Sequence, residues 1–362
     1  MSQLFNEIVA VDNFDDAYNK SQKGKSKYKT DAMKFSQDLT KNLEDLRWQI
    51  FFNEYEFGEY IYFKVYEPKE RDIHAPQFED KLVQLAINNV LKHIYQPCFI
   101  YDSYACLDNK GTHKAINRVS HFIRKAAWQY GDDAFIIKLD ISKFFYTIDR
   151  DVLKGILKKK IKCKRTLDLL FTIIDSANDI DSLGLPLGNL TSQLFANVYM
   201  NEFDNYCKRK LSLKYYVRYA DDAIAIVKNK DEAKVILELM KRFLKRNLKL
   251  NTNEKKTRIF PIEQGVNAYG FKIYKTHRLL RNDSKKKIKR KAKKMRRLIT
   301  EELMTVEKAE QILNSWKGHA KYGCSYNFIK SLLERNDYIY MNHKGILKVN
   351  VNKLKEGDVD VA

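Results

Sequence analysis

Residues 214–227 have the sequence Lys-Tyr-Tyr-Val-Arg-Tyr-Ala-Asp-Asp-Ala-Ile-Ala-Ile-Val. Two runs of β-branched and aromatic residues flank a pair of adjacent carboxylates, Asp221 and Asp222. Because Asp is disfavoured inside strands, this pattern predicts a tight hairpin with both aspartates at its tip. Neighbouring carboxylates repel each other unless a cation lies between them, and their oxygens suit Mg²⁺ or Mn²⁺. A solvated turn is the commoner explanation of an isolated Asp-Asp pair, so the rest of the chain must distinguish a turn from a metal site.

A second strand that ends on a carboxylate lies upstream of the hairpin. Residues 134–140 have the sequence Ala-Phe-Ile-Ile-Lys-Leu-Asp, a short apolar strand ending on Asp140. A carboxylate at the end of a buried strand is costly unless it is paired or bound to a metal. We therefore predict that Asp140 joins Asp221 and Asp222 in one metal site.

A loop punctuated by glycine and proline precedes the hairpin. Residues 184–193, Gly-Leu-Pro-Leu-Gly-Asn-Leu-Thr-Ser-Gln, lead into a helix that we expect to be capped by Thr191 or Ser192. Loops of this kind at helix N-termini bind phosphates or hold a backbone close. The loop is therefore a candidate substrate-binding element.

The N-terminal part of the chain predicts helices and a pair of exposed cations. Apolar residues recur at helical spacing over residues 31–52 and again over residues 78–95. Between them, the strand-like residues 60–66 are followed by Lys69 and Arg71. Two cations just past a strand end can hold a phosphate, although a solvated loop is the default interpretation.

The composition predicts a globular protein with a polyanionic partner. The chain has 362 residues, 44% of them hydrophobic, and such a length corresponds to roughly two to three domains or lobes. The net charge is +21, from 67 Lys and Arg against 46 Asp and Glu, which favours a phosphate backbone through counterion release. A basic run at residues 285–297 is typical of a solvated face, but it also suits a helix lying against nucleic acid. The candidate backbone contacts are Lys285, Lys286, Lys287, Lys289, Arg290, Lys293 and Lys294.

The cysteines and the first residues bear on the compartment. The five cysteines are widely spaced and include no Cys-x-x-Cys pair. This pattern indicates neither a disulfide framework nor a zinc site, and it fits a reducing cytosol. The first residues lack a basic start followed by an apolar run, and no stretch approaches the ~18 apolar residues of a membrane span. We therefore expect a cytoplasmic protein that is neither secreted nor associated with a membrane.

Five motifs in a fixed order together resemble the reverse transcriptases. They are a strand ending in Asp, a Gly-x-x-x-Ser loop, a Tyr-x-Asp-Asp hairpin, a Lys-bearing segment and a Tyr-Gly-Phe turn, and they lie between about Phe63 and Tyr274. The resemblance implies an α+β right-hand polymerase fold with fingers, a palm of antiparallel sheet plus helices, and a helical thumb. The expected domains are an N-terminal arm and helix at 1–60, fingers at 61–133 with part of 150–190, a palm at 134–274, a basic helical thumb at 275–340 and a C-terminal tail at 341–362.

The likeness is closer to the reverse transcriptases of bacterial and phage diversity-generating retroelements. Residues 185–193 end in Ser-Gln, where retroviral and group II intron enzymes typically have Ser-Pro, and residues 63–76 and 102–113 also resemble that group. The resemblance implies error-prone, adenine-mutagenic cDNA synthesis from a template RNA, an RNA/cDNA hybrid, and a small basic oligomeric accessory protein as partner. Leu187 stands where many relatives have a Gln that braces the incoming nucleotide. Losing that amide should lower discrimination between nucleotides.

The resemblance also implies roles for individual residues. Asp140 and Asp221, helped by the backbone carbonyl of Ile141 and with Asp222 nearby, would hold two Mg²⁺ ions, with Mn²⁺ as an alternative. Phe145 would be the bulky gate against a ribose 2′-OH, although a core aromatic is a serious competing interpretation. The residues that would contact the incoming dNTP are Lys69, Arg71, Phe145, Leu187, Gly188, Gln193 and Lys256. The residues of the primer grip would be Tyr269, Gly270 and Phe271.

The resulting hypothesis is two-metal nucleotidyl transfer by an RNA-directed DNA polymerase. One ion would lower the pKa of the primer 3′-OH, and the other would neutralise the triphosphate and the leaving pyrophosphate. A defence-associated reverse transcriptase of the abortive-infection type would share the palm residues, and neighbouring genes would distinguish it. A catalytically silent RNA-binding scaffold is disfavoured because the three carboxylates and the candidate triphosphate cations are all present.

Overall fold

The computed structural model describes residues 3–23, 30–66, 70–176 and 182–355. They fold into two compact units, each assembled from several segments of the chain. All three candidate carboxylates belong to the first unit. The first unit contains residues 1–111, 137–225 and 231–259, and the second contains residues 112–136, 226–230 and 260–362.

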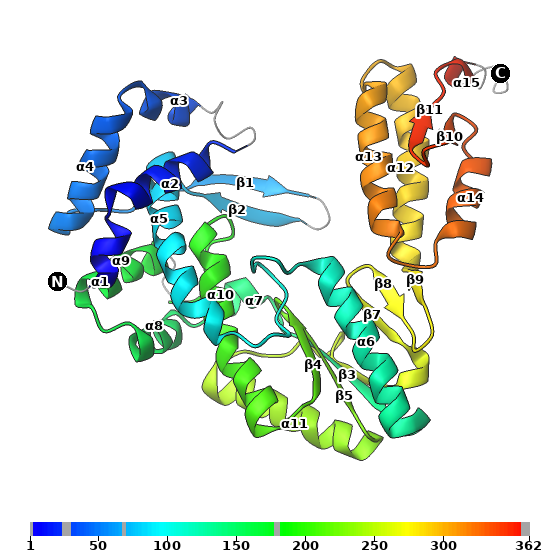
Figure 1. Cartoon of the computed structure of the whole chain (residues 1–362), viewed down its shortest axis with the longest axis horizontal. Coiled ribbons are helices and arrows are strands. Elements are labelled where there is room, and N and C mark those ends of the chain that lie inside the picture. The colour runs from blue at the N-terminus through cyan, green and yellow to red at the C-terminus, as the bar shows by residue number, and fades with distance from the viewer. Residues whose placement is uncertain (1–2, 24–29, 67–69, 177–181, 356–362) are drawn as a thin grey trace. The chain divides into compact units, whose positions relative to one another are not determined.

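Helices make up most of the first unit. They are α1 (Gln3–Ile8), α2 (Val11–Ser21), α3 (Thr30–Gln37), α4 (Leu39–Phe52), α5 (Phe78–Tyr95), α7 (Phe144–Thr147), α8 (Arg150–Lys160), α9 (Lys164–Asp175), α10 (Leu190–Asn205) and α11 (Lys230–Asn247, whose first residue belongs to the second unit). α5 is buried along most of its length, and α1, α2 and α10 pack against it (Figure 1). The predicted helix over residues 78–95 is therefore confirmed as the central helix of this unit.

Two sheets accompany these helices in the described part of the chain. β1 (Ile61–Val65) and β2 (Arg71–Ala75) form an antiparallel hairpin in which Val65 pairs with Arg71. A four-stranded sheet has the order β4-β5-β3-β6. Its strands are β3 (Phe135–Asp140), β4 (Tyr215–Tyr219), β5 (Asp222–Val227) and β6 (Arg258–Pro261). Most of these residues belong to the first unit, whereas the first two residues of β3 and the last two of β5 and of β6 are assigned to the second. The predicted hairpin is confirmed: β4 and β5 are neighbours, with Ala220 and Asp221 between them.

Two local expectations about helix ends were wrong. The helix predicted over residues 31–52 is two helices, because Asp38 leaves the helical region with φ −130° and ψ 64°. α10 has Asn189 as its N-cap, not Thr191 or Ser192. The reason is that the Gln84 side chain of α5 already accepts hydrogen bonds from the first backbone N–H groups of α10, that of Leu190 at 2.7 Å among them.

The second unit combines small sheets with helices. Its elements are α6 (Thr112–Tyr130), β7 (Val266–Ala268), β8 (Phe271–Ile273), β9 (Arg278–Leu280), α12 (Asn282–Thr300), α13 (Val306–Ala320), α14 (Tyr326–Glu334), β10 (Ile339–Met341), β11 (Leu347–Val349) and α15 (Asn352–Lys355). β7, β8 and β9 form an antiparallel sheet, and β10 pairs with β11. Leu347, Val349 and Leu354, from the segment expected to be a C-terminal tail, pack in one hydrophobic cluster with α12 and α13.

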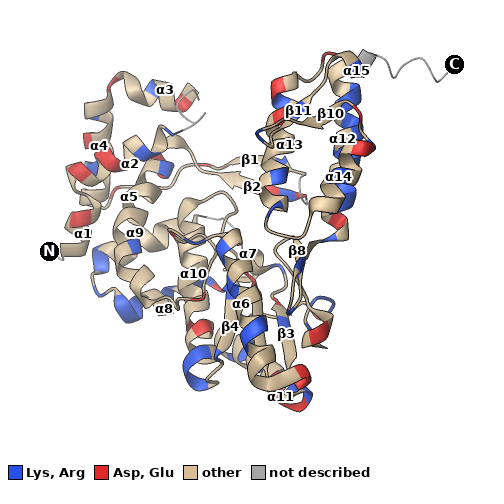
Figure 2. Cartoon of the chain, turned by 45° about the vertical axis from the view of Figure 1, so that its right-hand side comes forward, with Lys and Arg blue, Asp and Glu red and all other residues tan. Residues whose placement is uncertain are grey.

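α12 shows how a strongly basic helix is held in place. Ile288, Ala292 and Met295 lie at i, i+4 and i+7 and are buried in that cluster, which is the spacing of one helix face. Most of the other residues of the helix are Lys or Arg (Figure 2). Six of the candidate backbone contacts are exposed and Lys285 is half-buried, with its amine 5.6 Å from the ring of Phe328. No helix in the described ranges is long and apolar enough to cross a membrane.

Candidate active site

The three candidate carboxylates are brought to one edge of the four-stranded sheet. Asp140 is the last residue of β3, Asp221 lies in the turn between β4 and β5, and Asp222 is the first residue of β5. β3 and β5 are neighbours in the sheet, and the backbone N–H of Ile141 donates to the Asp221 carbonyl at 3.1 Å. The end of β3 and the hairpin tip are thus joined directly, although the residues are far apart in sequence.

Asp140, Asp221 and Asp222 affect one another's protonation. Burial raises the pKa of Asp222 to about 6, with Asp140 and Asp221 acting in the same direction and Lys138 opposing them. Burial also raises the pKa of Asp221, where the charge of Asp140 adds to the effect. Lys256 and Arg71 are near enough to Asp221 to counter this rise. The site therefore carries an excess of negative charge that nearby cations only partly offset.

Two lysines form ion pairs with the carboxylates. The amine of Lys256 lies 2.8 and 2.9 Å from the two carboxylate oxygens of Asp140. The amine of Lys138 lies 3.2 Å from Asp222. As the side chains stand, no three His, Cys, Asp or Glu residues in the described ranges form a group that could hold a metal ion. Lys256 contacts both carboxylate oxygens of Asp140 from a side chain that is 47% exposed, so it competes with a cation for Asp140.

The donor set fits a divalent cation. The Oδ1 atom of Asp222 is buried and has no hydrogen-bond partner among the residues that the structure describes. A buried, unpaired carboxylate oxygen is costly, and a metal ion would satisfy it. Carboxylate and carbonyl oxygens are the ligands that Mg²⁺ and Mn²⁺ prefer. Asp140, Asp221, Asp222 and the carbonyl of Ile141 are the residues that could supply them.

The glycine-containing loop before α10 is docked against β2. The backbone N–H of His74 in β2 donates to the Leu187 carbonyl at 2.7 Å. Gly188 has φ +136°, and a Cβ atom placed on it would lie 2.2 Å from the His74 carbonyl oxygen. Only glycine therefore allows this approach of the two backbones. Leu187 is half-buried, and Gln193 is exposed in the first turn of α10.

The remaining candidate nucleotide contacts lie around the same loop. Phe145 is half-buried in α7, whereas its neighbour Phe144 is 4% exposed. The Phe145 carbonyl accepts a hydrogen bond from the Leu185 N–H at 2.7 Å, which ties α7 to the loop. Arg71 begins β2 and its side chain is exposed. Lys69 lies outside the described residues.

The candidate primer grip lies in the second unit. Tyr269 has φ +50° and Gly270 has φ +91°, so both occupy the left-handed region in the turn before β8. Phe271 is fully buried, with its ring centroid 4.7 Å from that of His319. Burial lowers the pKa of His319, and His113 adds to the effect. A Cβ atom on Gly270 would lie 2.9 Å from Nε2 of His319, so this histidine packs against the turn.

Two functional features escaped the sequence analysis. Lys138 lies two residues before Asp140 in β3, and alternate residues of a strand share a face, so this spacing was a usable signal for its ion pair with Asp222. The second feature is Arg218, a fully buried cation in β4. An arginine inside the aromatic run Tyr-Tyr-Val-Arg-Tyr was visible, but its side-chain partners Ser103, Asn197 and Asp204 come from other segments and had no local signal.

Comparisons with known proteins agree with one another. A family model described as reverse transcriptase (RNA-dependent DNA polymerase) matches residues 67–309. Protein YkfC of Escherichia coli is 29% identical over 265 residues, which cover 61% of this chain and 67% of that protein. The group II intron-encoded protein LtrA of Lactococcus lactis is 25% identical, with 57% and 44% covered. The Retron Ec73 reverse transcriptase of Escherichia coli is 27% identical, with 48% and 55% covered.

The extent of these matches differs between the relatives. The chain spans about two thirds of the YkfC protein but less than half of LtrA, and 29% of a putative COX1/OXI3 intron 2 protein of Saccharomyces cerevisiae. Among solved structures, telomerase from Candida albicans gives a TM-score of 0.46 at 10% identity, covering 63% of this chain and 46% of that one.

Proposed function

Since the reverse transcriptase model covers well over half of its residues, this chain belongs to the reverse transcriptase family and has its α+β polymerase fold, and on that premise we propose that it is an RNA-directed DNA polymerase. The observation that carries the proposal is the meeting of Asp140, Asp221 and Asp222 at one sheet edge, within reach of Arg71 and Lys256. Extension of a DNA primer on an RNA template by the purified chain, with Mg²⁺ or Mn²⁺, tests it directly. Absence of extension with both metals would overturn it.

The domains follow from this proposal. We assign the fingers to residues 61–133 with part of 150–190, the palm to 134–274 and the thumb to 275–340. The N-terminal arm and helix are 1–60, and the C-terminal segment is 341–362, in which Leu347, Val349 and Leu354 pack with the helices of the proposed thumb. The thumb assignment rests on the basic surface of α12, whose exposed Lys and Arg residues suit a nucleic-acid backbone.

Enzymes of this family generally use divalent metal ions. We assign Asp140, Asp221 and the Ile141 carbonyl as the ligands of two Mg²⁺ ions, with Asp222 completing the acidic cluster. When bound, the ions supply activation of the primer 3′-OH and neutralisation of the triphosphate. The protein's own contribution is to hold the carboxylates in place and to provide cations. In this proposal Arg71 would contact the triphosphate, and Lys256, released from Asp140, would donate a proton or a hydrogen bond to the leaving pyrophosphate; the influence of both cations on Asp221 supports these roles.

The finer role that we propose is mutagenic cDNA synthesis in a diversity-generating retroelement. The substrates would be a template RNA, the growing RNA/cDNA hybrid and dNTPs, and a small basic oligomeric protein would be the accessory partner. Leu187 and Gln193 in and after the loop support this subtype. Sequencing of the cDNA tests it: errors concentrated at template adenines support the role, and uniform accuracy across the four template bases contradicts it.

The identity of residue 187 should affect fidelity. Replacing Leu187 by Gln offers an amide that can brace the incoming nucleotide, and one added hydrogen bond of ~1 kcal/mol corresponds to about a fivefold gain in discrimination. We expect misincorporation at template adenines to fall by that factor, as measured by deep sequencing of cDNA. Leu187→Met is the matched control, because it keeps an apolar side chain of similar volume and should leave the error rate unchanged. An equal fall in both variants would contradict the role of the amide.

Phe145 should exclude ribonucleotides. Removing its ring in Phe145→Ala opens space beside the sugar, and we expect the preference for dNTP over rNTP to fall by about 10- to 200-fold, the range for a steric pocket contact. The measurement is kcat/KM for dTTP and UTP on the same primer and template. Phe144→Ala is the control, because that ring is buried and its loss should lower stability by about 3–5 kcal/mol without changing sugar selectivity. If Phe145→Ala behaves like Phe144→Ala, then Phe145 is a core residue.

A further inference from the structure

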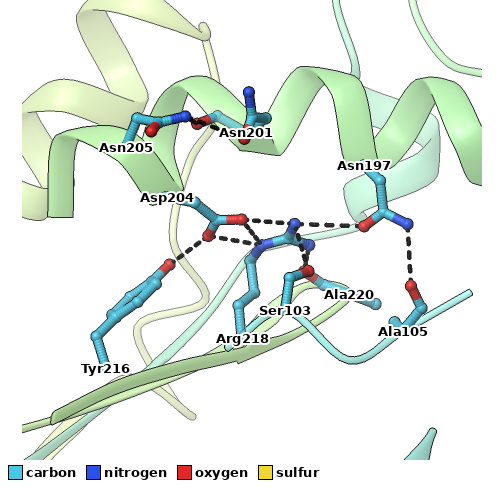
Figure 3. A network of polar contacts seen from close by, with 9 residues as sticks. All are labelled: Ser103, Ala105, Asn197, Asn201, Asp204, Asn205, Tyr216, Arg218 and Ala220. Atoms are coloured by element: carbon cyan, nitrogen blue, oxygen red, sulfur yellow. Dashed lines mark hydrogen bonds and ion pairs between the residues drawn. The ribbon is translucent and has the colours of Figure 1, made fainter. Parts of the chain in front are cut away.

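Arg218 in β4 is 1% exposed and its partner Asp204 in α10 is fully buried. The Nε atom of Arg218 donates to both carboxylate oxygens of Asp204, at 2.8 and 2.9 Å, and Nη2 donates to one of them at 2.8 Å (Figure 3). Tyr216 donates to the same carboxylate at 2.8 Å. A buried charge must be paired in this way, and the ion pair with Asp204 explains the hydrogen bonds along one edge of the guanidinium.

The rest of the guanidinium reaches toward the candidate active site. Nη1 donates to the carbonyl oxygen of Ala220 at 3.0 Å, and Nη2 also donates to the side chains of Ser103 and Asn197 (Figure 3). Ala220 is the residue immediately before Asp221, and its φ of +53° lies in the left-handed region. A residue with a Cβ atom rarely adopts this conformation unless its surroundings hold it there. The hydrogen bond from Arg218 is one contact that holds this turn.

The turn is held from the other side as well. The carbonyl of Asp221, one residue further on, accepts the N–H of Ile141, and the carbonyl of Asp140 accepts the N–H of Asn253 at 2.7 Å. A continuous series of contacts therefore leads from Asp204 through Arg218 and the left-handed turn to the end of β3. The carboxylates of Asp140 and Asp221 lie at the end of this series.

We propose that Arg218 is a positioning residue that fixes the left-handed turn at Ala220 and so aims Asp221 for divalent-cation binding. This inference rests on the proposed polymerase function, to which it adds Arg218 as a residue that supports the carboxylates. Asp204 and Asn197 of α10 and Ser103 orient the guanidinium. The planar fork of arginine is required, because it bonds Asp204 and the Ala220 carbonyl at the same time, whereas the point charge of a lysine cannot serve these separate acceptors in one geometry.

Three variants separate positioning from general stabilisation. Arg218→Lys keeps the charge beside Asp204 but loses the fork. Asp204→Asn/Arg218→Met removes both charges together, and neutral replacement of a buried ion pair often preserves stability, so this variant carries the test if the lysine variant does not fold. Tyr216→Phe is the matched control: it removes a buried hydrogen bond to Asp204 but leaves Arg218 and its bond to Ala220 in place.

Each variant is measured in three ways. The first is kcat and KM for dTTP on an RNA template of polyadenylate with an oligo(dT) primer. The second is Mn²⁺ affinity by electron paramagnetic resonance without primer, template or nucleotide, and the third is Tm. Outer-shell partners of metal ligands typically contribute about 10- to 100-fold to affinity or activity. We expect Arg218→Lys and the double variant to lose kcat and Mn²⁺ affinity by that factor, with KM nearly unchanged. Tyr216→Phe should lower Tm but keep the kcat and the Mn²⁺ affinity of the parent chain.

Two results would overturn the inference. One is that the arginine variants keep kcat and Mn²⁺ affinity within about twofold of the parent chain, where the proposed effect is at least about tenfold. The other is that Tyr216→Phe loses as much kcat and Mn²⁺ affinity as the arginine variants do, with losses that follow the fall in Tm across the variants. The network would then be a general stabiliser. If the parent chain extends no primer, the proposed function fails by itself, and the Mn²⁺ titration still decides whether Arg218 positions the carboxylates.

Discussion

Replacing Asp140 or Asp221 by Asn is expected to reduce primer extension by on the order of 10³-fold, because each change removes a charge that stabilises the reacting phosphate through the bound cation. The amide has nearly the same shape, so the fold should persist. RNA affinity depends on Lys and Arg contacts to phosphates and should survive. The measurements are single-nucleotide extension with Mg²⁺ and with Mn²⁺, and RNA binding by fluorescence anisotropy.

Asp231→Asn provides the control for the loss of one carboxylate. Its side chain is 89% exposed near the start of α11 and pairs with Lys234 at 3.0 Å, an exposed pair of a kind that contributes about 0–1 kcal/mol. This variant should therefore retain the activity of the parent chain. Full activity in either Asp140→Asn or Asp221→Asn would show that the site assignment is wrong.

Gly188→Ala should be the most damaging change outside the carboxylates. The new Cβ atom would lie 2.2 Å from the His74 carbonyl oxygen, in a backbone conformation that disfavours any side chain. The bond between the His74 N–H and the Leu187 carbonyl must then lengthen or break, and β2, which carries Arg71, must shift. Misplacing a substrate-positioning group by ~1 Å costs on the order of 100-fold. We expect a loss of that size in kcat/KM for dNTP, measured by steady-state primer extension.

Gly155→Ala is the matched control for this glycine. Gly155 lies inside α8, and within the described part of the chain a Cβ atom there would meet nothing within 4 Å apart from its chain neighbours and the nearby backbone of its own helix. Alanine is favoured over glycine in a helix interior by roughly 0.5–1 kcal/mol, so this variant should be slightly more stable and fully active. If Gly188→Ala keeps the kcat/KM of the parent chain, the loop does not position β2 for substrate binding.

The sequence was sufficient to predict the elements that carry the carboxylates. An apolar strand ending on Asp140 and an acidic hairpin at Asp221 are local patterns, and both exist as predicted. What it could not supply is which elements lie next to each other. The ion pair between Lys256 and Asp140 depends on the order of strands in the sheet. The docking of Gly188 on His74 depends on a hairpin more than a hundred residues away in sequence.

The local errors have the same origin. α10 begins at Leu190, ahead of Thr191, and Gln84 from another helix accepts the N–H groups of Leu190 and Thr191 that this earlier start would otherwise leave without a partner. Asp38 interrupts a run of apolar residues that is helical by spacing alone. At the start of α10 a contact from another helix decides the structure, and at Asp38 the backbone angles do. A single sequence shows neither the contact nor the angles.

The length of α10 separates two sites on which selection can act independently. Its N-terminal end follows the loop that contains Leu187, whereas Asp204 near its C-terminal end holds Arg218, and 14 residues of helix separate Leu190 from Asp204 by about 20 Å. On the proposed roles, the side chain at position 187 can therefore change without disturbing the turn that carries Asp221, whereas Gly188 cannot change, because it holds the loop against His74. Under the roles proposed for Leu187 and Arg218, a lineage could exchange copying accuracy for diversity at one end of this helix while the positioning of Asp221, at the other end, stays under separate selection.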